Sequence, residues 1–100
     1  MKINKKILQK TIDKYGPAVQ AIVAIEELAE LQKEICKTWR KPIESCIDSL
    51  CDEIADVYIM LEQLQIIFML DKNKQIQKRI DYKINRLKNR LEAADENKNM

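Results

Sequence analysis

Two pairs of carboxylates, each spaced three residues apart, are the residues of this sequence best suited to chemistry. Glu27 and Glu30 form the first pair, and Glu53 and Asp56 form the second. On a helix, Glu53 and Asp56 fall within roughly 80° of arc with apolar residues of the same segment. Burying an unpaired carboxylate costs several kcal/mol, so four of them beside packed faces would repel one another unless they are partly protonated or hold a cation. Oxygen ligands without nitrogen or sulfur favour Mg²⁺, with Mn²⁺ as a substitute.

A plainer interpretation is that these acids are solvated or paired with lysines. Glutamates three residues apart are common on charged helices, and spacing alone does not separate the two interpretations. The position of Glu53 and Asp56 in line with the apolar stripe favours the metal site.

Composition excludes several other kinds of site. The 100-residue chain contains no histidine, which excludes Ser-His-Asp triads, His-ligated zinc and Glu-x-x-His di-iron sites. A single glycine, Gly16, leaves neither a phosphate-binding loop nor a dinucleotide fingerprint. The chemistry that remains is that of carboxylates, lysines and arginines.

Charge is distributed unevenly along the chain. Residues 26–62 carry ten acids against four bases, and residues 74–90 carry seven bases against one acid. On a helix over the second stretch, four cations fall within roughly 60° and could face an anion: Arg79, Lys83, Arg86 and Arg90. A solvated face is the alternative. One basic helix beside an acidic segment offers too little positive surface to bind the phosphate backbone of a nucleic acid well, so nucleic acid is not an expected partner.

The elements that must position these residues are helices. Scarce glycine and proline, with abundant Ile, Leu, Glu, Lys and Gln, predict an all-α fold. Helix-ending and helix-starting residues predict helices over 3–15, 17–39, from 42–45 to 70, and 74–93, with a turn at 71–73. We expect an antiparallel four-helix bundle in one domain, residues 1–93, with a frayed tail over 94–100. The third helix is apolar over much of its circumference, so a homodimer or homotetramer is expected to complete the bundle.

The sequence also allows predictions of where the protein is located and of the role of its single tryptophan. No apolar run follows the charged N-terminus, and the longest runs are far below the roughly 20 residues that span a bilayer. Together with three cysteines that lack C-x-x-C spacing, this predicts a cytoplasmic protein without a membrane partner. Trp39 is expected to be a packing cap at a helix end, with stacking on a base as the alternative.

Two motifs, taken together, resemble those of a known family. Residues 26–30 read EELAE and residues 53–56 read EIAD, which is similar to the EExxE…ExxD signature of the MazG-like all-α nucleoside triphosphate pyrophosphohydrolases. This superfamily includes the dimeric dUTPases and the phosphoribosyl-ATP pyrophosphohydrolases. The stretches EIADVYIMLEQL and YKINRLKNRL look like the short single-domain phage and bacterial members. The resemblance covers roughly residues 22–91.

The resemblance implies a ligand set and a reaction. Mg²⁺ would be held by Glu27, Glu30, Glu53 and Asp56. Glu26 would be an auxiliary acid that orients water, and Lys83 and Arg86 match the family's phosphate-binding K-x-x-R. Asp81 stands where many relatives have asparagine, and no phosphate contact is assigned to it.

The implied reaction is hydrolysis of a nucleoside triphosphate, ribo- or deoxyribo-, to the monophosphate and pyrophosphate. The alternative is a degenerate family member that serves as a non-catalytic helical interaction module.

Overall fold

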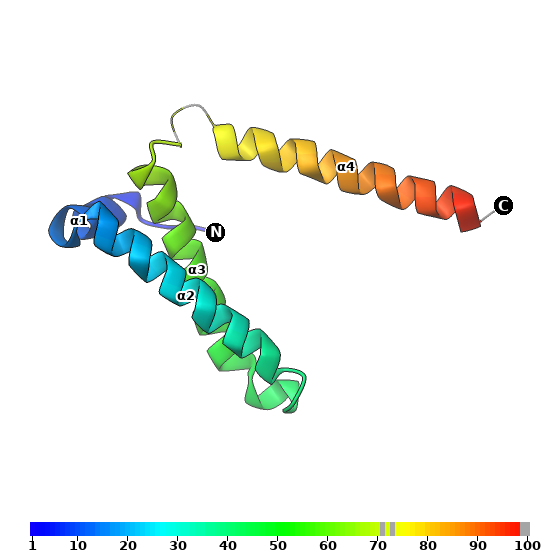
Figure 1. Cartoon of the computed structure of the whole chain (residues 1–100), viewed down its shortest axis with the longest axis horizontal. Helices are drawn as coiled ribbons and strands as arrows, with labels where there is room; N and C mark the ends of the chain where they lie inside the picture. The colour runs from blue at the N-terminus through cyan, green and yellow to red at the C-terminus, as the bar shows by residue number, and fades with distance from the viewer. Residues whose placement is uncertain (71, 73, 99–100) are drawn as a thin grey trace. The chain divides into compact units, whose positions relative to one another are not determined.

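The protein is described by a computed structural model covering residues 1–70, 72 and 74–98. The predicted all-α fold is confirmed, since this part of the chain holds four α-helices, one short 3-10 helix and no β-strand. The elements, in order, are α1 (Lys5–Tyr15), α2 (Pro17–Lys37), η1 (Ile43–Ser45), α3 (Ile47–Ile67) and α4 (Gln75–Lys98). Figure 1 shows them along the chain.

Helix boundaries follow from local hydrogen bonding. The side chain of Asn4 caps α1 by accepting from the backbone N–H groups of Lys6 and Ile7, so this helix begins two residues after the predicted start. Gly16 separates α1 from α2 and has a φ of +93°, a backbone conformation that residues other than glycine rarely adopt. Its N–H donates to the Ile12 carbonyl. Pro17 then opens α2, as the sequence predicts.

Three of the later boundaries differ from the prediction. α2 ends at Lys37, before the predicted residue 39, and the Thr38 hydroxyl donates to the Ile35 carbonyl just beyond this end. The stretch after Pro42 forms η1, and α3 starts only at Ile47. α3 also ends at Ile67, before the predicted residue 70. Residues 71 and 73 of the predicted turn lie outside the described residues.

α4 continues to Lys98. The predictions that this helix ends at residue 93 and that the chain frays from residue 94 were therefore wrong for residues 94–98. Ala93 and Ala94 are strong helix formers, and no glycine or proline follows them. An ion pair between Lys88 and Glu92, with Nζ and Oε1 4.0 Å apart, supports the same turn of the helix. Residues 99 and 100 lie outside the described part of the chain.

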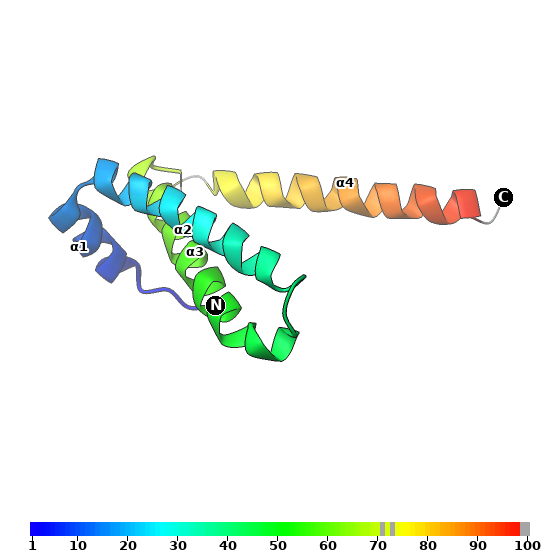
Figure 2. The ribbon, with the colours of Figure 1, turned by 60° about the horizontal axis from the view of Figure 1, so that its bottom comes forward.

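The chain divides into two compact units, Met1–Phe68 and Met69–Met100, where the sequence predicted one domain over residues 1–93. In the first unit α2 and α3 lie side by side as an antiparallel hairpin, and α1 packs at the end opposite the connecting turn (Figures 1 and 2). The second unit contains one helix, α4.

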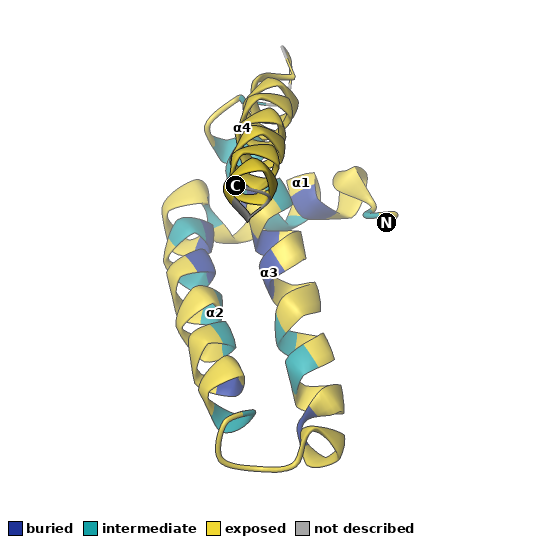
Figure 3. Cartoon of the chain, turned by 90° about the vertical axis from the view of Figure 1, so that its right-hand side faces the viewer, coloured by how far each residue is buried: buried dark blue, intermediate teal, exposed yellow. Residues whose placement is uncertain are grey.

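The core of the first unit is thin. Its buried apolar residues are Leu8, Ile12, Ala24, Cys46, Val57 and Met60. Figure 3 shows the buried positions of α2 and α3 on the sides where the two helices face each other. A buried hydrogen bond also joins the helices, from Gln20 Nε2 to Gln63 Oε1 at 2.7 Å. Three of the carboxylates predicted to do chemistry, Glu27, Glu53 and Asp56, come together where these two helices meet.

Candidate metal centre

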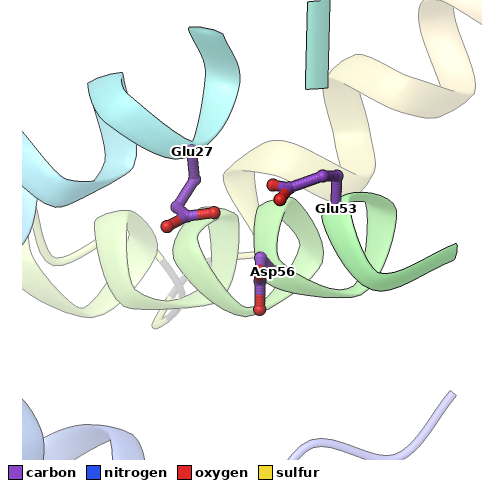
Figure 4. A group of neighbouring side chains, drawn as sticks. All are labelled: Glu27, Glu53 and Asp56. Carbon is purple, nitrogen blue, oxygen red and sulfur yellow. The ribbon is translucent and has the colours of Figure 1, made fainter. Parts of the chain in front are cut away.

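Three of the predicted carboxylates converge between α2 and α3. Glu27 comes from α2, and Glu53 and Asp56 come from successive turns of α3 (Figure 4). Each residue offers one carboxylate oxygen, and these oxygens all lie within 4.8 Å of one another. Glu27 and Glu53 are half-buried, and Asp56 is exposed. The group of three carboxylates is therefore partly buried and partly open to solvent.

The electrostatics of the group oppose full ionisation. Burial, followed by the proximity of Glu53 and Asp56, raises the pKa of Glu27 from an ordinary value of 4.5 to about 7. Like charges this close favour the protonated form of one of them. No lysine or arginine forms an ion pair with any of the three within the described residues. Within the described part of the first unit, these acids are therefore not paired with lysines, and the exposed Asp56 agrees with the solvated form of the plainer interpretation.

One atom of the group is left without a partner. Oxygen Oε2 of Glu53 is buried and has no hydrogen-bond partner among the described residues. Buried polar atoms are normally satisfied, so such an atom calls for an explanation. Either a bound cation or the proton of Glu27, whose pKa is raised by burial and by a hydrogen bond to Glu53, would satisfy this carboxylate.

The chemistry of the donors fits Mg²⁺. In octahedral coordination with bonds of about 2.1 Å, neighbouring ligands of this ion stand about 3.0 Å apart and opposite ligands about 4.2 Å apart. The three oxygens, which lie within 4.8 Å of one another, would therefore have to draw together to hold one ion. Three carboxylate oxygens would leave the ion further positions for water and phosphate oxygens. The donors of Glu27, Glu53 and Asp56 are thus of the type that Mg²⁺ takes, and these residues would hold the implied ion.

Two of the predicted acids lie outside the converging group. Glu30 and Glu26 are both exposed on α2. Glu30 is three residues from Glu27, so its side chain is turned about 60° around the helix. The structure brings together three of the four predicted ligands and leaves Glu30 and Glu26 at the rim.

Glu34 is a buried acid of α2 that was not among the predicted ligands. Its side chain is 9% exposed, and Oε1 accepts from Lys37 Nζ at 2.9 Å. Hydrogen bonding and charge from Glu34 raise the pKa of Lys37. Oε2 of Glu34 is buried without a partner in the described part of the chain. Seven residues rotate a helix by only about 20°, so Glu34 shares the face of Glu27 more closely than Glu30 does. The seven-residue spacing from Glu27 was the feature of the sequence that could have singled out Glu34.

Trp39 is not the packing cap that was expected, because 87% of its surface is exposed. Ten residues of α2 separate Glu27 from Lys37, which is about 15 Å along the helix axis. Trp39 lies beyond that end, so it does not stack on a base held next to the three carboxylates of its own chain.

The predicted phosphate-binding residues, Lys83 and Arg86, lie on α4 and are exposed. Their spacing of three places them on one face of the helix. The Arg79 guanidinium lies 4.8 Å from the ring centroid of Tyr82 on the same helix. This engages one of the four cations of the predicted stripe with an aromatic side chain.

None of the helices in the described residues is long and apolar enough to cross a bilayer.

Comparisons of the chain with protein-family models, with curated proteins and with solved structures find no match.

Proposed function

We propose that this protein hydrolyses nucleoside triphosphates to the monophosphate and pyrophosphate in a Mg²⁺-dependent reaction. The observation that carries the proposal is the convergence of Glu27, Glu53 and Asp56, with Oε2 of Glu53 buried and unpartnered among the described residues. The EELAE and EIAD motifs support the same reaction by resemblance.

In this proposal the roles of the residues follow from their charge and position. Glu27, Glu53 and Asp56 hold the ion, which when bound screens the phosphate charge and polarises the phosphoryl group. Glu26 and Glu30, exposed beside Glu27, accept hydrogen bonds from the attacking water and orient it. Lys83 and Arg86 match the phosphate-binding K-x-x-R of the family by resemblance, and their charge suits phosphate oxygens. Positioning and electrostatics of this kind carry most of the catalysis in phosphoryl transfer.

The test is product analysis with a panel of NTPs and dNTPs, with and without Mg²⁺. We expect pyrophosphate and monophosphate to be released only with Mg²⁺, and Glu53→Gln to abolish turnover while helical content stays intact. The matched control is Asp52→Asn, because Asp52 is an exposed acid on the same helix outside the converging group. Turnover retained in Glu53→Gln would refute the assignment of the site.

A second candidate function is a non-catalytic helical interaction module. The many exposed apolar side chains favour it, among them Ile22 at 56% and Ile25 at 66% exposure on α2. It predicts no turnover of any nucleotide and no Mg²⁺ binding above the weak background of a charged surface. Isothermal titration with Mg²⁺, compared between the wild type and Glu53→Gln, separates the two candidates.

A further inference from the structure

The N-terminal segment and α3 line an open cavity of about 190 Å³, largely apolar, which we call the chamber: Met1, Lys2, Ile3, Ala55, Tyr58 and Ile59. An adjoining cavity of about 310 Å³ shares the N-terminal segment and adds the charged side chains of Lys5 and Glu62. Figures 1 and 2 both show the N-terminus beside α3. The two cavities thus place an apolar chamber beside a polar one on the same helix.

This chamber lies close to the candidate metal centre. Ala55 immediately precedes Asp56 in the chain, and Ile59 follows Asp56 by three residues. Residues three apart on a helix have Cβ atoms about 5–6 Å apart. Ile59 is thus the lining residue nearest to Asp56 on the helix surface, whereas Tyr58 lies about 160° around α3 from Asp56. A ligand with its phosphates at the three carboxylates would bend around α3 to place its other end in the chamber.

The lining suits a flat heterocycle. Tyr58 is 43% exposed, so part of its ring is available for stacking. A volume of about 190 Å³ corresponds to about six water molecules at about 30 Å³ each, which a flat ring would displace. The neighbouring Lys2, Lys5 and Glu62 offer donors and acceptors to the polar edge of such a ring.

We propose that the chamber binds the nucleobase of the nucleoside triphosphate whose phosphates lie at Glu27, Glu53 and Asp56. This inference rests on the proposed function and adds to it the part of the protein that recognises the base. An aromatic side chain stacks on any base, so polar contacts from the neighbouring cavity would determine which base binds most tightly.

The first test is the steady-state kinetics of Tyr58→Ala. Loss of a stacking partner should raise KM by about five- to a hundred-fold and leave kcat nearly unchanged. Ala55→Phe, which fills the chamber, should have the same effect. Tyr15→Ala is the matched control, because Tyr15 is an exposed tyrosine of the same unit that lines neither cavity. An unchanged KM in both Tyr58→Ala and Ala55→Phe would overturn the inference.

The second test uses inorganic tripolyphosphate, which carries the phosphates without a nucleoside. Its inhibition constant should be the same in wild type, Tyr58→Ala and Ala55→Phe. Equal weakening of tripolyphosphate and nucleotide would overturn the inference, because the variants would then act on the phosphate end or on the fold.

Equilibrium binding of an α,β-methylene nucleoside triphosphate with Mg²⁺ separates this inference from the proposed function. Binding that depends on Tyr58 without pyrophosphate release would support the chamber and refute the hydrolase. Hydrolysis with a KM indifferent to Tyr58 and Ala55 would support the hydrolase and refute the chamber. No binding of the analogue would refute both.

Discussion

At the scale of single residues, Glu27 is the group most perturbed by its surroundings. Burial and the two neighbouring carboxylates raise its pKa to about 7 from an ordinary 4.5. The folded protein then binds more protons than the unfolded chain between these two pH values. Stability from this group is fully present below about pH 4.5 and is lost as pH rises through about 7.

We therefore expect the metal-free protein to lose stability as pH rises from 5 to 8, by about 1–3 kcal/mol from this half-buried group. Glu27→Gln should flatten the dependence, since the amide does not titrate. Urea unfolding in EDTA, followed by circular dichroism at several pH values, measures both proteins. A decline of equal size in Glu27→Gln would assign the titration to other groups. Saturating Mg²⁺ should also remove the loss, because the ion binds deprotonated carboxylates.

At the scale of the helices, the register of α2 on α3 decides which carboxylates meet. The buried bond from Gln20 to Gln63 lies toward one end of this interface, and Glu27 meets Glu53 and Asp56 further along it. Both glutamines are buried, at 6% and 3% exposure. A polar pair within an apolar interface fixes the register, because sliding either helix leaves both amides unsatisfied.

Gln63→Leu should cost about 1–3 kcal/mol in the free energy of unfolding, since it leaves the Gln20 amide buried without its partner. The double variant Gln20→Leu/Gln63→Leu should recover most of this loss, because both polar groups are then gone. Urea denaturation of the wild type, both single variants and the double variant completes the cycle. Strictly additive losses would show that the two side chains act independently.

The helices were predictable because their signals are local. Gly16 and Pro17 fix the junction of α1 and α2 by backbone conformation alone, and the carboxylate spacing placed Glu53 and Asp56 on one face of α3. Which α2 acid meets them depends on contacts between residues distant in sequence, such as Gln20 with Gln63. For that reason the structure brings Glu27 to Glu53 and Asp56 and leaves Glu30 outside the group, and the buried Glu34 was not among the predicted ligands.

At the scale of the whole molecule, the first unit taken by itself exposes an aligned apolar face on α3. Side chains at intervals of seven residues stay open there: Ile47 at 47%, Ile54 at 38% and Leu61 at 43% exposure. Seven-residue spacing keeps one face of a helix aligned, as in helices that pair along a seam. α4 has apolar residues at the same spacing, Ile80 and Leu87.

Self-association therefore remains our prediction, with a dimer or tetramer covering the face formed by Ile47, Ile54 and Leu61. Glu at position 54 or 61 would bring a carboxylate into the covered interface, where an unpaired charge is costly. Ile54→Glu and Leu61→Glu should thus shift the protein toward the monomer in sedimentation velocity runs over a range of concentrations. Ser49→Glu, at an exposed polar position of the same helix, is the control and should leave the distribution unchanged. A wild-type chain that sediments as a monomer at every concentration would contradict the prediction, because its exposed face would then be stable in water without a partner.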